Sequence, residues 1–345
     1  MTEFPQKHWP VVSIYSLSHF FVDFACALLM FRFIAGTKEA YASVLLYNFC
    51  AFAMQMPLGI IADKWNRNFL FAIIGCALVG FAFAFTAFPI IAALVIGLGN
   101  AMFHLGGGID VLNISQKKLS ALGVFVSPGA FGITFGTILG RESGFPPYLM
   151  PVLMIVSAGL ILAMHKARKG THPPNASFSL KSASTWHAVI AVACLFLVVC
   201  LRSYVGLALN FPWKGLGHLG TALVCAVVFG KTIGGFASDQ FGVVKTSILS
   251  LGIAALLFLF PHIPITGITA VLLFNMTMPI TLWAMARLFP GAKGFAFGLL
   301  TFGLFIGFLP VFFNTHIPMN TLWLFPLITV LSLALLLTGL RKVKQ

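Results

Sequence analysis

Charged side chains are scarce in this sequence. Asp, Glu, Lys and Arg make up 8% of its 345 residues, whereas 59% are hydrophobic. Soluble domains are normally about a quarter charged, so the composition excludes a water-soluble globular protein and predicts a polytopic membrane protein. The acidic residues number 7 against 21 basic ones. Because the cations stand in short loops between apolar runs, we interpret them as topology signals and expect no nucleic-acid partner.

Signatures of enzymes, metal sites and nucleotide sites are also missing. The six cysteines lie inside apolar runs without a Cys-x-x-Cys pair, so neither a disulfide framework nor a metal site is expected. The sequence contains no His-Glu-x-x-His motif, no nucleophile–base pair and no nucleotide-binding loop. We therefore expect neither enzymatic activity nor a cofactor.

Long apolar runs predict twelve membrane-spanning helices, because about 20 apolar residues are needed to cross the hydrocarbon layer. We expect these spans at 10–33, 40–62, 68–87, 89–113, 118–140, 146–165, 186–208, 215–238, 243–260, 263–288, 294–313 and 320–340. Most basic loop residues then lie on the side of the chain termini, which the positive-inside rule assigns to the cytoplasm. We expect a multi-pass protein of the cell membrane with both termini cytoplasmic.

A short charged segment follows the second predicted span and recurs after the eighth, about half a chain later. Both copies contain a glycine, an aspartate four residues on, and a nearby cation. The residues concerned are Gly59, Asp63, Lys64 and Arg67 in the first copy and Gly235, Asp239 and Lys245 in the second. Duplicated membrane halves are typical of transporters. We predict an N-terminal six-helix bundle at 1–165, a cytoplasmic linker at 166–185 and a C-terminal six-helix bundle at 186–345.

These segments are candidate gating elements. A glycine lets a neighbouring helix approach closely, and a carboxylate can accept backbone N–H bonds at the start of an adjoining helix. Such contacts would hold the cytoplasmic side closed in one state and break in another. The alternative is a charge cluster that only sets topology.

The first copy resembles the Gly-x-x-x-Asp-Arg/Lys-x-Gly-Arg/Lys-Arg/Lys motif of the major facilitator superfamily. Asn66 stands where the family prefers glycine, and Asn68 stands where it prefers a cation. The resemblance implies an all-α fold with two pseudo-symmetric six-helix bundles, and an ion pair between Arg67 and Asp110. Arg287, close to the repeat-related position of Asp110, is expected at the cytoplasmic end of the tenth span.

Ionisable side chains inside apolar spans are costly and are by default site hypotheses. Asp23 lies near the middle of the first span, one helical turn after His19, so the two side chains share a face. With His104 of the fourth span they are candidates for proton coupling; the alternative is a static contact between helices. Arg202 of the seventh span suits an oxyanion, because its planar guanidinium can bind in a bidentate manner. A static bridge to Asp23 is the alternative.

Other polar residues in the spans divide into two groups. Candidate solute contacts beside Arg202 are Lys231, Gln55, Asn100 and Asn275. Three residues near the outer ends of spans one and five favour a rim cluster over a deep site: Arg32, Arg141 and Glu142.

Three segments resemble the fosmidomycin-resistance type of efflux protein within the same superfamily. They are Ser16-Leu17-Ser18-His19 with Asp23, Gly97-Leu98-Gly99 with Phe103-His104, and Leu288-Phe289-Pro290-Gly291. The resemblance implies proton-coupled antiport that exports a small organic solute, with an anion as one option. The alternatives are a proton symporter that takes up an organic anion and, more remotely, a non-transporting receptor or scaffold. The expected partners are a small-molecule substrate, protons and the lipid bilayer, and a monomer is expected.

Overall fold

The computed structural model describes residues 8–115, 118–142, 144–168, 177–180, 186–315 and 323–343, and in these residues it contains helices and no strands. Eleven of the described helices are long and apolar enough to cross a membrane, and a twelfth apolar helix, α11 (Val243–Leu257), is shorter. The predicted all-α membrane fold is confirmed. The terminal residues 1–7 and 344–345, and residues 169–176 and 181–185 of the predicted linker, lie outside the described part.

The chain forms two compact units. The first unit consists of Met1–Gln116, Val124–Phe178 and Gly291–Gly298, and the second consists of Lys117–Gly123, Ser179–Pro290 and Leu299–Gln345. Each unit therefore includes one short segment that the predicted boundaries place in the other half. Both segments are the beginnings of helices, α14 (Lys293–Phe312) in the first unit and α6 (Ser120–Val126) in the second.

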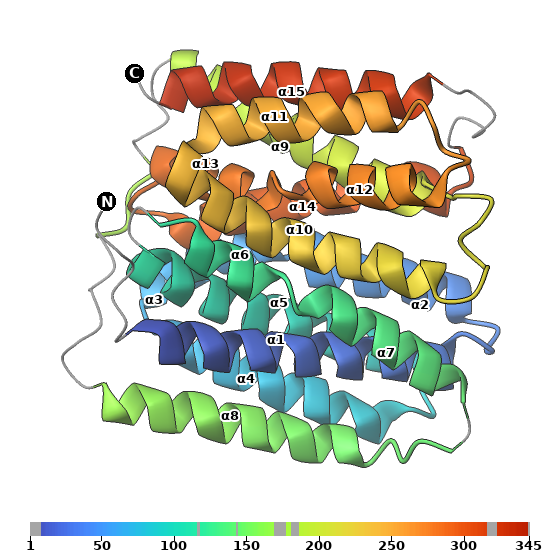
Figure 1. Cartoon of the computed structure of the whole chain (residues 1–345). Coiled ribbons are helices and arrows are strands. Elements are labelled where there is room, and N and C mark those ends of the chain that lie inside the picture. The colour runs from blue at the N-terminus through green and yellow to red at the C-terminus, as the bar shows by residue number, and fades with distance from the viewer. Residues whose placement is uncertain are drawn as a thin grey trace. The chain divides into compact units, whose positions relative to one another are not determined.

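The first unit contains α-helices of different lengths, some of them continued by short π-helical or 3-10 segments. They are α1 (Trp9–Leu29), η2 (Met30–Ile34), α2 (Ala40–Asn48), η3 (Phe49–Ala53), α3 (Gln55–Trp65), α4 (Asn68–Phe81), η4 (Ala82–Phe85), α5 (Pro89–Ser115), α7 (Gly129–Arg141) and α8 (Leu149–Ala167). Helix α4 packs against α5 and α8, and α1 packs against α7 (Figure 1). The segments η2 and η3 are π-helical turns. Such turns often occur at functional sites.

Glycines on α7 allow it to approach α1 closely. A Cβ atom added at Gly132 would collide with the carbonyl of Phe20, and one added at Gly136 would collide with the carbonyl of Phe24. These glycines are four residues apart, so they lie on one face of the helix. The close packing fixes the stretch of α1 that carries His19 and Asp23.

The second unit contains α9 (Trp186–Ala208), α10 (Leu219–Phe241), α11, α12 (Pro264–Asn275), α13 (Met278–Leu288) and α15 (Leu324–Val343). Helix α15 packs against α9 and α11, and α10 packs against α12 (Figure 1). The predicted span 263–288 is two helices, interrupted at Met276 and Thr277. Pro279 explains the interruption, because it has no backbone N–H and its ring would clash with the carbonyl four residues earlier.

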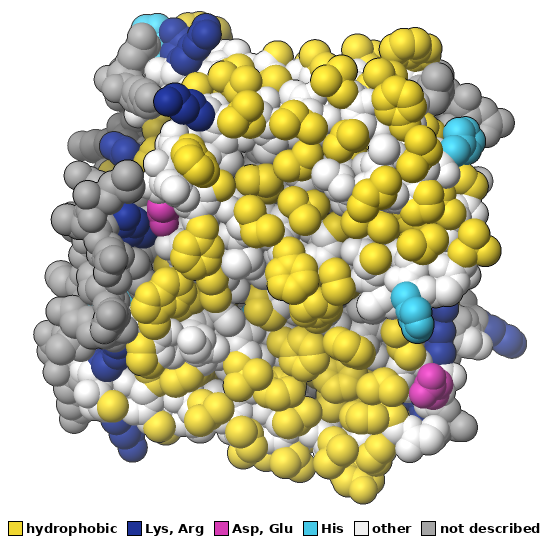
Figure 2. All heavy atoms as spheres, in the orientation of Figure 1, with side chains coloured by type: hydrophobic (Ala, Val, Ile, Leu, Met, Phe, Trp, Pro, Cys, Tyr) yellow, Lys and Arg dark blue, Asp and Glu magenta, His cyan; other side chains and the backbone are white. Residues whose placement is uncertain are grey.

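The surface agrees with a membrane environment. Hydrophobic side chains lie along the lengths of the helices on the visible face, whereas Lys and Arg side chains gather where helices end (Figure 2). Large apolar side chains such as Ile155 and Leu327 are 72% and 66% exposed. Such exposure is expected when lipid chains, and not water, surround the helices.

Candidate functional site

Two helices of the first unit bring four polar side chains together. Helix α1 contributes His19 and Asp23, and α5 contributes Asn100 and His104. His19, Asp23 and Asn100 are buried, with 6%, 8% and 2% of their surface exposed, and His104 is half-buried. We name these four residues the histidine–aspartate cluster. The structure thus brings together the three residues that the sequence predicted for proton coupling.

Backbone carbonyls fix the hydrogen on one nitrogen of each histidine. Nδ1 of His19 lies 2.7 Å from the carbonyl oxygen of Phe125, and Nδ1 of His104 lies 2.8 Å from that of Asn100. Since a carbonyl oxygen only accepts hydrogen bonds, each Nδ1 must donate one. In a neutral imidazole the other nitrogen, Nε2, is then an acceptor.

The two Nε2 atoms face each other at 2.9 Å. Two acceptors cannot form a hydrogen bond, so a hydrogen bond between these nitrogens needs one further proton on one of the two rings. The geometry therefore offers a position for one exchangeable proton.

The carboxylate of Asp23 supplies the matching negative charge. One oxygen lies 3.2 Å from Nε2 of His19, and the other lies 3.7 Å from Nε2 of His104. The amide of Asn100 donates to the second oxygen at 3.0 Å. With one shared proton the cluster is electrically neutral overall, which reduces the cost of burying it.

Among the residues that the structure describes, this cluster is also the one group of His, Cys, Asp and Glu side chains that could hold a metal ion. One ligand atom each from His19, Asp23 and His104 lies within 4.8 Å of the others. A tetrahedral zinc ion with Zn–N bonds of about 2.0–2.1 Å would separate two ligand nitrogens by roughly 3.3 Å. The observed 2.9 Å is instead the length of an N–H···N hydrogen bond.

Arg202 of α9 is the main buried charge of the second unit. Its side chain is 8% exposed, and its guanidinium donates to the hydroxyl oxygens of Thr277 at 3.1 Å and Thr281 at 3.2 Å. Both threonines lie where the tenth span is interrupted. Neither partner carries a charge.

Asp63, at the end of α3, caps the beginning of α14. Its carboxylate accepts the backbone N–H groups of Gly294 at 2.8 Å and Phe295 at 2.9 Å. A Cβ atom added at Gly59, one turn earlier, would collide with the backbone of Gly294. Lys293 extends the contact, because its ammonium donates to the side-chain oxygen of Asn113 at 2.7 Å.

Asp239 repeats this arrangement in the second unit. Its carboxylate accepts the backbone N–H groups of Leu119 at 2.7 Å and Ser120 at 3.0 Å, where α6 begins. A Cβ atom added at Gly235 would lie 2.6 Å from the carbonyl oxygen of Leu119. In each unit, a motif glycine and its aspartate therefore hold the start of another helix.

Asp110 has partners other than the expected one. Its carboxylate accepts the hydroxyl of Tyr15 at 2.6 Å and the amide of Asn68 at 2.8 Å. Arg67 is exposed, and within the described residues no ion pair joins it to Asp110. Asn68 is buried at the beginning of α4, which packs on α5, so its amide lies beside the carboxylate.

The other cations expected at the gate lie at the surface. The ammonium of Lys64 lies 5.2 Å from the ring centre of Phe178, and the guanidinium of Arg287 lies 4.9 Å from that of Trp283. Lys245 is exposed. The two ring contacts hold Lys64 and Arg287, and no ion pair between the described residues joins either of them to an acid.

Two of the three rim residues contact each other. Arg32 donates to the backbone carbonyl of Glu142, and the guanidinium of Arg141 lies 4.8 Å from the ring centre of Phe31. The described contact between Arg32 and Glu142 thus uses the backbone of Glu142. The helix ends of η2 and α7 are joined there.

The remaining candidate solute contacts lie on separate helices. Gln55 of α3 is 1% exposed, and its amide nitrogen donates to the carbonyl of Ala51 at 2.5 Å, while its side-chain oxygen has no hydrogen-bond partner among the described residues. Asn275 at the end of α12 is half-buried and donates to the carbonyl of Val271 at 2.8 Å. Lys231 of α10 is half-buried.

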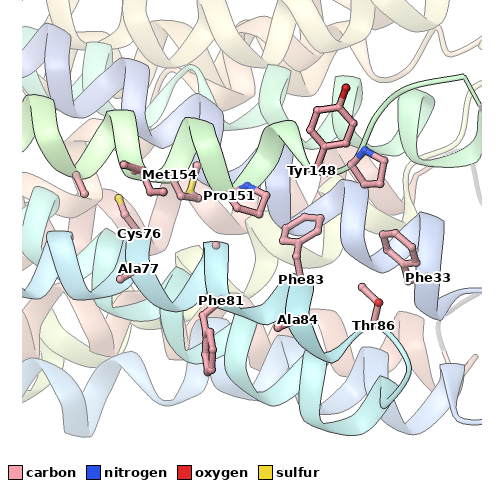
Figure 3. A pocket seen from close by; sticks show the side chains of 14 residues that line it. Phe33, Cys76, Ala77, Phe81, Phe83, Ala84, Thr86, Tyr148, Pro151 and Met154 are labelled. Carbon is pink, nitrogen blue, oxygen red and sulfur yellow. The ribbon is translucent and has the colours of Figure 1, made fainter.

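A separate apolar pocket of about 810 Å³ lies in the first unit between α4, η4 and α8 (Figure 3). Aromatic and aliphatic side chains line it, among them Phe33, Phe83, Tyr148 and Met154. It contains no charged side chain and none of the polar residues described above. Its polar side chains are uncharged: Thr86, Tyr148 and Cys76.

Several residues at these sites were not predicted. Thr277 and Thr281 were not predicted because an uncharged threonine in an apolar run carries no motif, although Pro279 in the middle of that run signals a helix break. The carbonyl of Phe125 could not be found from sequence, since every residue has a carbonyl. Tyr15, the hydroxyl partner of Asp110, carries no motif.

Comparisons with known proteins support the fold. No family model matches the chain, and no curated protein matches it. Among solved structures, a variant of the E. coli fucose:proton symporter FucP gives a TM-score of 0.71 at 15% identity and covers 100% of both chains. A FucP structure described as a major facilitator superfamily transporter in the outward conformation gives 0.69 at 15% identity, covering 98% of this chain and 99% of that one.

A bacterial homologue of the iron transporter ferroportin, in an outward-facing state, gives a TM-score of 0.60 at 14% identity and covers 97% of this chain and 98% of that one. At these identities the likeness concerns the fold alone. The chain therefore has the major facilitator fold, which confirms the predicted fold class. The structures to which it is similar are those of transporters.

Proposed function

We propose, from the major facilitator fold of this chain, that it is a secondary transporter that couples the movement of a small organic solute to protons. The observation that carries the proposal is the 2.9 Å contact between the Nε2 atoms of His19 and His104. This contact defines a buried position for one proton, and Asp23 balances its charge. A group that gains and loses a proton between two states is the element that proton coupling needs.

The proton moves when the helices around the cluster move. His19 and Asp23 lie on α1, whereas His104 and Asn100 lie on α5, so a shift between these helices would separate the two Nε2 atoms. Each ring would then become a separate acceptor, and the pair would lose its preference for the shared proton. Asn100 positions the carboxylate through its 3.0 Å hydrogen bond.

The two aspartate caps are the proposed gates. Asp63 holds the start of α14, and Asp239 holds the start of α6. Each cap combines two charge-assisted hydrogen bonds with the positive end of a helix dipole. In one arrangement the Asp63 cap on α14 would be broken and the Asp239 cap on α6 kept, and in the other arrangement the reverse.

Export by antiport is the favoured direction, in accord with the resemblance to fosmidomycin-resistance proteins. Symport is the second candidate, since the similar FucP structure is that of a fucose:proton symporter. The same histidine–aspartate cluster serves either direction. We further propose that the protein works as a monomer in the cell membrane with both termini in the cytoplasm, and that Arg202, Lys231, Gln55 and Asn275 face the solute.

The test begins with a thermal-unfolding screen of the purified full chain against organic anions, organic cations, sugars and divalent metals. A compound that binds only the folded state raises the melting temperature. At a concentration of 100 times its Kd it adds about 2.7 kcal/mol to the free energy of unfolding. The strongest binder is then added to proteoliposomes that contain a pH-sensitive dye. We expect the solute to drive proton movement, and its direction separates antiport from symport.

Three variants make this test specific. Asp23→Asn and His104→Gln should abolish solute-driven proton movement but leave solute exchange measurable. His187→Gln is the matched control, because His187 is exposed at the start of α9 and lies outside the cluster. Normal proton movement by Asp23→Asn would disprove the coupling role. Binding of a divalent metal that Asp23→Asn and His104→Gln both abolish would identify the cluster as a metal site instead.

A further inference from the structure

The tenth span is interrupted near its middle, at the point where Arg202 reaches it. Helix α12 ends at Asn275, and α13 begins at Met278 with Thr277 as its N-cap residue. The start of a helix carries a partial positive charge and unpaired backbone N–H groups. Interrupted membrane helices commonly direct such an end toward an anionic group.

Arg202 adds a full positive charge to this end. Its guanidinium contacts Thr277 and Thr281 through their hydroxyl oxygens. The hydroxyl hydrogens are already used, because Thr277 donates to the carbonyl of Phe274 at 3.1 Å and Thr281 to that of Met278 at 2.9 Å. The threonines therefore hold the guanidinium in place as neutral acceptors. Two of its five N–H groups are engaged in this way.

No carboxylate of the second unit balances this charge. The sequence of that unit contains a single acidic residue, Asp239. Its two carboxylate oxygens accept the N–H groups of Leu119 and Ser120. Arg202, of which 8% is exposed, thus holds its guanidinium beside the positive end of a helix without a carboxylate partner in its own unit. Burying a charge in this way is expensive.

We propose that Arg202, held in place by Thr277 and Thr281, binds the oxyanionic group of the solute at the start of α13, and that the solute is an organic anion with one carboxylate or phosphonate group. A planar guanidinium binds two oxygens of such a group at once. The ligand supplies the charge that the unit lacks. This inference rests on the proposed function only in taking the bound anion to be the transported solute.

The test compares anions with neutral compounds of the same size. The melting temperature of the purified full chain is measured with butyrate, with methylphosphonate and with butyramide. Arg202→Gln is the test variant, and Arg287→Gln is the matched control. Arg287 lies on α13 as well, but it is exposed and stacks on Trp283. Thr277→Val keeps the shape of the side chain and removes its hydroxyl.

We expect butyrate or methylphosphonate, but not butyramide, to raise the melting temperature of the wild type and of Arg287→Gln. Losing a charge-assisted contact should weaken anion binding roughly 10- to 100-fold in Arg202→Gln. Thr277→Val should weaken it less, because the arginine keeps Thr281. Which anion binds more tightly separates carboxylate from phosphonate.

A second measurement needs no ligand. If the charge of Arg202 is balanced only by a bound anion, the ligand-free Arg202→Gln protein should be as stable as the wild type or more stable. The reason is that the substitution removes a buried unbalanced charge. A clearly lower melting temperature, or anion binding equal to that of the wild type, overturns the inference, and so does the absence of any response to either anion. Anion binding without proton movement in proteoliposomes would disprove the coupling and leave the anion site standing.

Discussion

Replacing Gly59 by alanine should destabilise the protein, against the usual effect of this change in a helix. An added Cβ atom would meet the carbonyl oxygen and carbon of Gly294 and the backbone nitrogen of Phe295. All three are backbone atoms, so no side chain can rotate away. The first turn of α14 would have to shift, and with it the two N–H groups that Asp63 accepts.

The magnitude follows from three contributions. Overpacking of a tight contact costs about 1–3 kcal/mol. Hydrogen bonds to a charged group contribute about 1.5–3 kcal/mol each, and part of this is lost when their geometry stretches. Alanine is favoured over glycine inside a helix by about 0.5–1 kcal/mol. We expect a net loss of about 1–3 kcal/mol for Gly59→Ala.

Gly159→Ala is the matched control. Gly159 lies on the exposed side of α8, and a Cβ atom added there would meet nothing within 4 Å. Only the helix preference then applies, so this change should stabilise the protein by about 0.5–1 kcal/mol. The two substitutions are chemically identical but are expected to have effects of opposite sign.

Thermal unfolding of both variants in the same detergent measures the difference. Amide hydrogen exchange should also become faster at Gly294 and Phe295 in Gly59→Ala but not in Gly159→Ala. If Gly59→Ala melts at or above the temperature of the wild type, α14 does not pack on Gly59, and the proposed gate loses its main support.

Three further predictions concern the other contacts. Asp239→Asn removes the charge from the second cap and should lower stability by about 1–2 kcal/mol, with faster amide exchange at Leu119 and Ser120; unchanged exchange there would contradict the cap. Tyr15→Phe removes the 2.6 Å hydrogen bond to Asp110 and should cost about 1.5–3 kcal/mol in thermal unfolding; a neutral effect would show that this bond adds nothing. The double change of Tyr15→Phe with Asp239→Asn should be additive, because the two sites lie in different units.

Much of the fold could be predicted from sequence because the membrane restricts the choice of structure. A backbone in hydrocarbon must satisfy its own hydrogen bonds, so an apolar run of sufficient length is a helix. The predicted span 186–208 has the same limits as α9. The two aspartate motifs identified the duplicated architecture, since glycine spacing and charge repeat visibly along the chain.

The candidate site was predicted less completely. His19, Asp23 and His104 stood out because ionisable groups are rare in apolar helices. That the Nε2 atoms of the two histidines face each other could not be predicted, because it depends on which ring nitrogen faces a backbone carbonyl. The expected pairing of Arg67 with Asp110 was wrong for a similar reason: a one-residue difference in position decides whether a side chain reaches its partner, and Asn68 is the one that does.

The sequence by itself determined that this is a membrane protein, that it is helical and that its halves are repeated. These properties follow from the apolar composition, the length of the apolar runs and the recurrence of the glycine–aspartate motif. Only the tertiary structure decided which charges are balanced. It placed two histidines beside Asp23, used Asp63 and Asp239 to cap helices, and left Arg202 without an acid in its unit. The physical reason is that the energy of a buried charge depends on atoms within a few ångströms, and folding alone brings those atoms together.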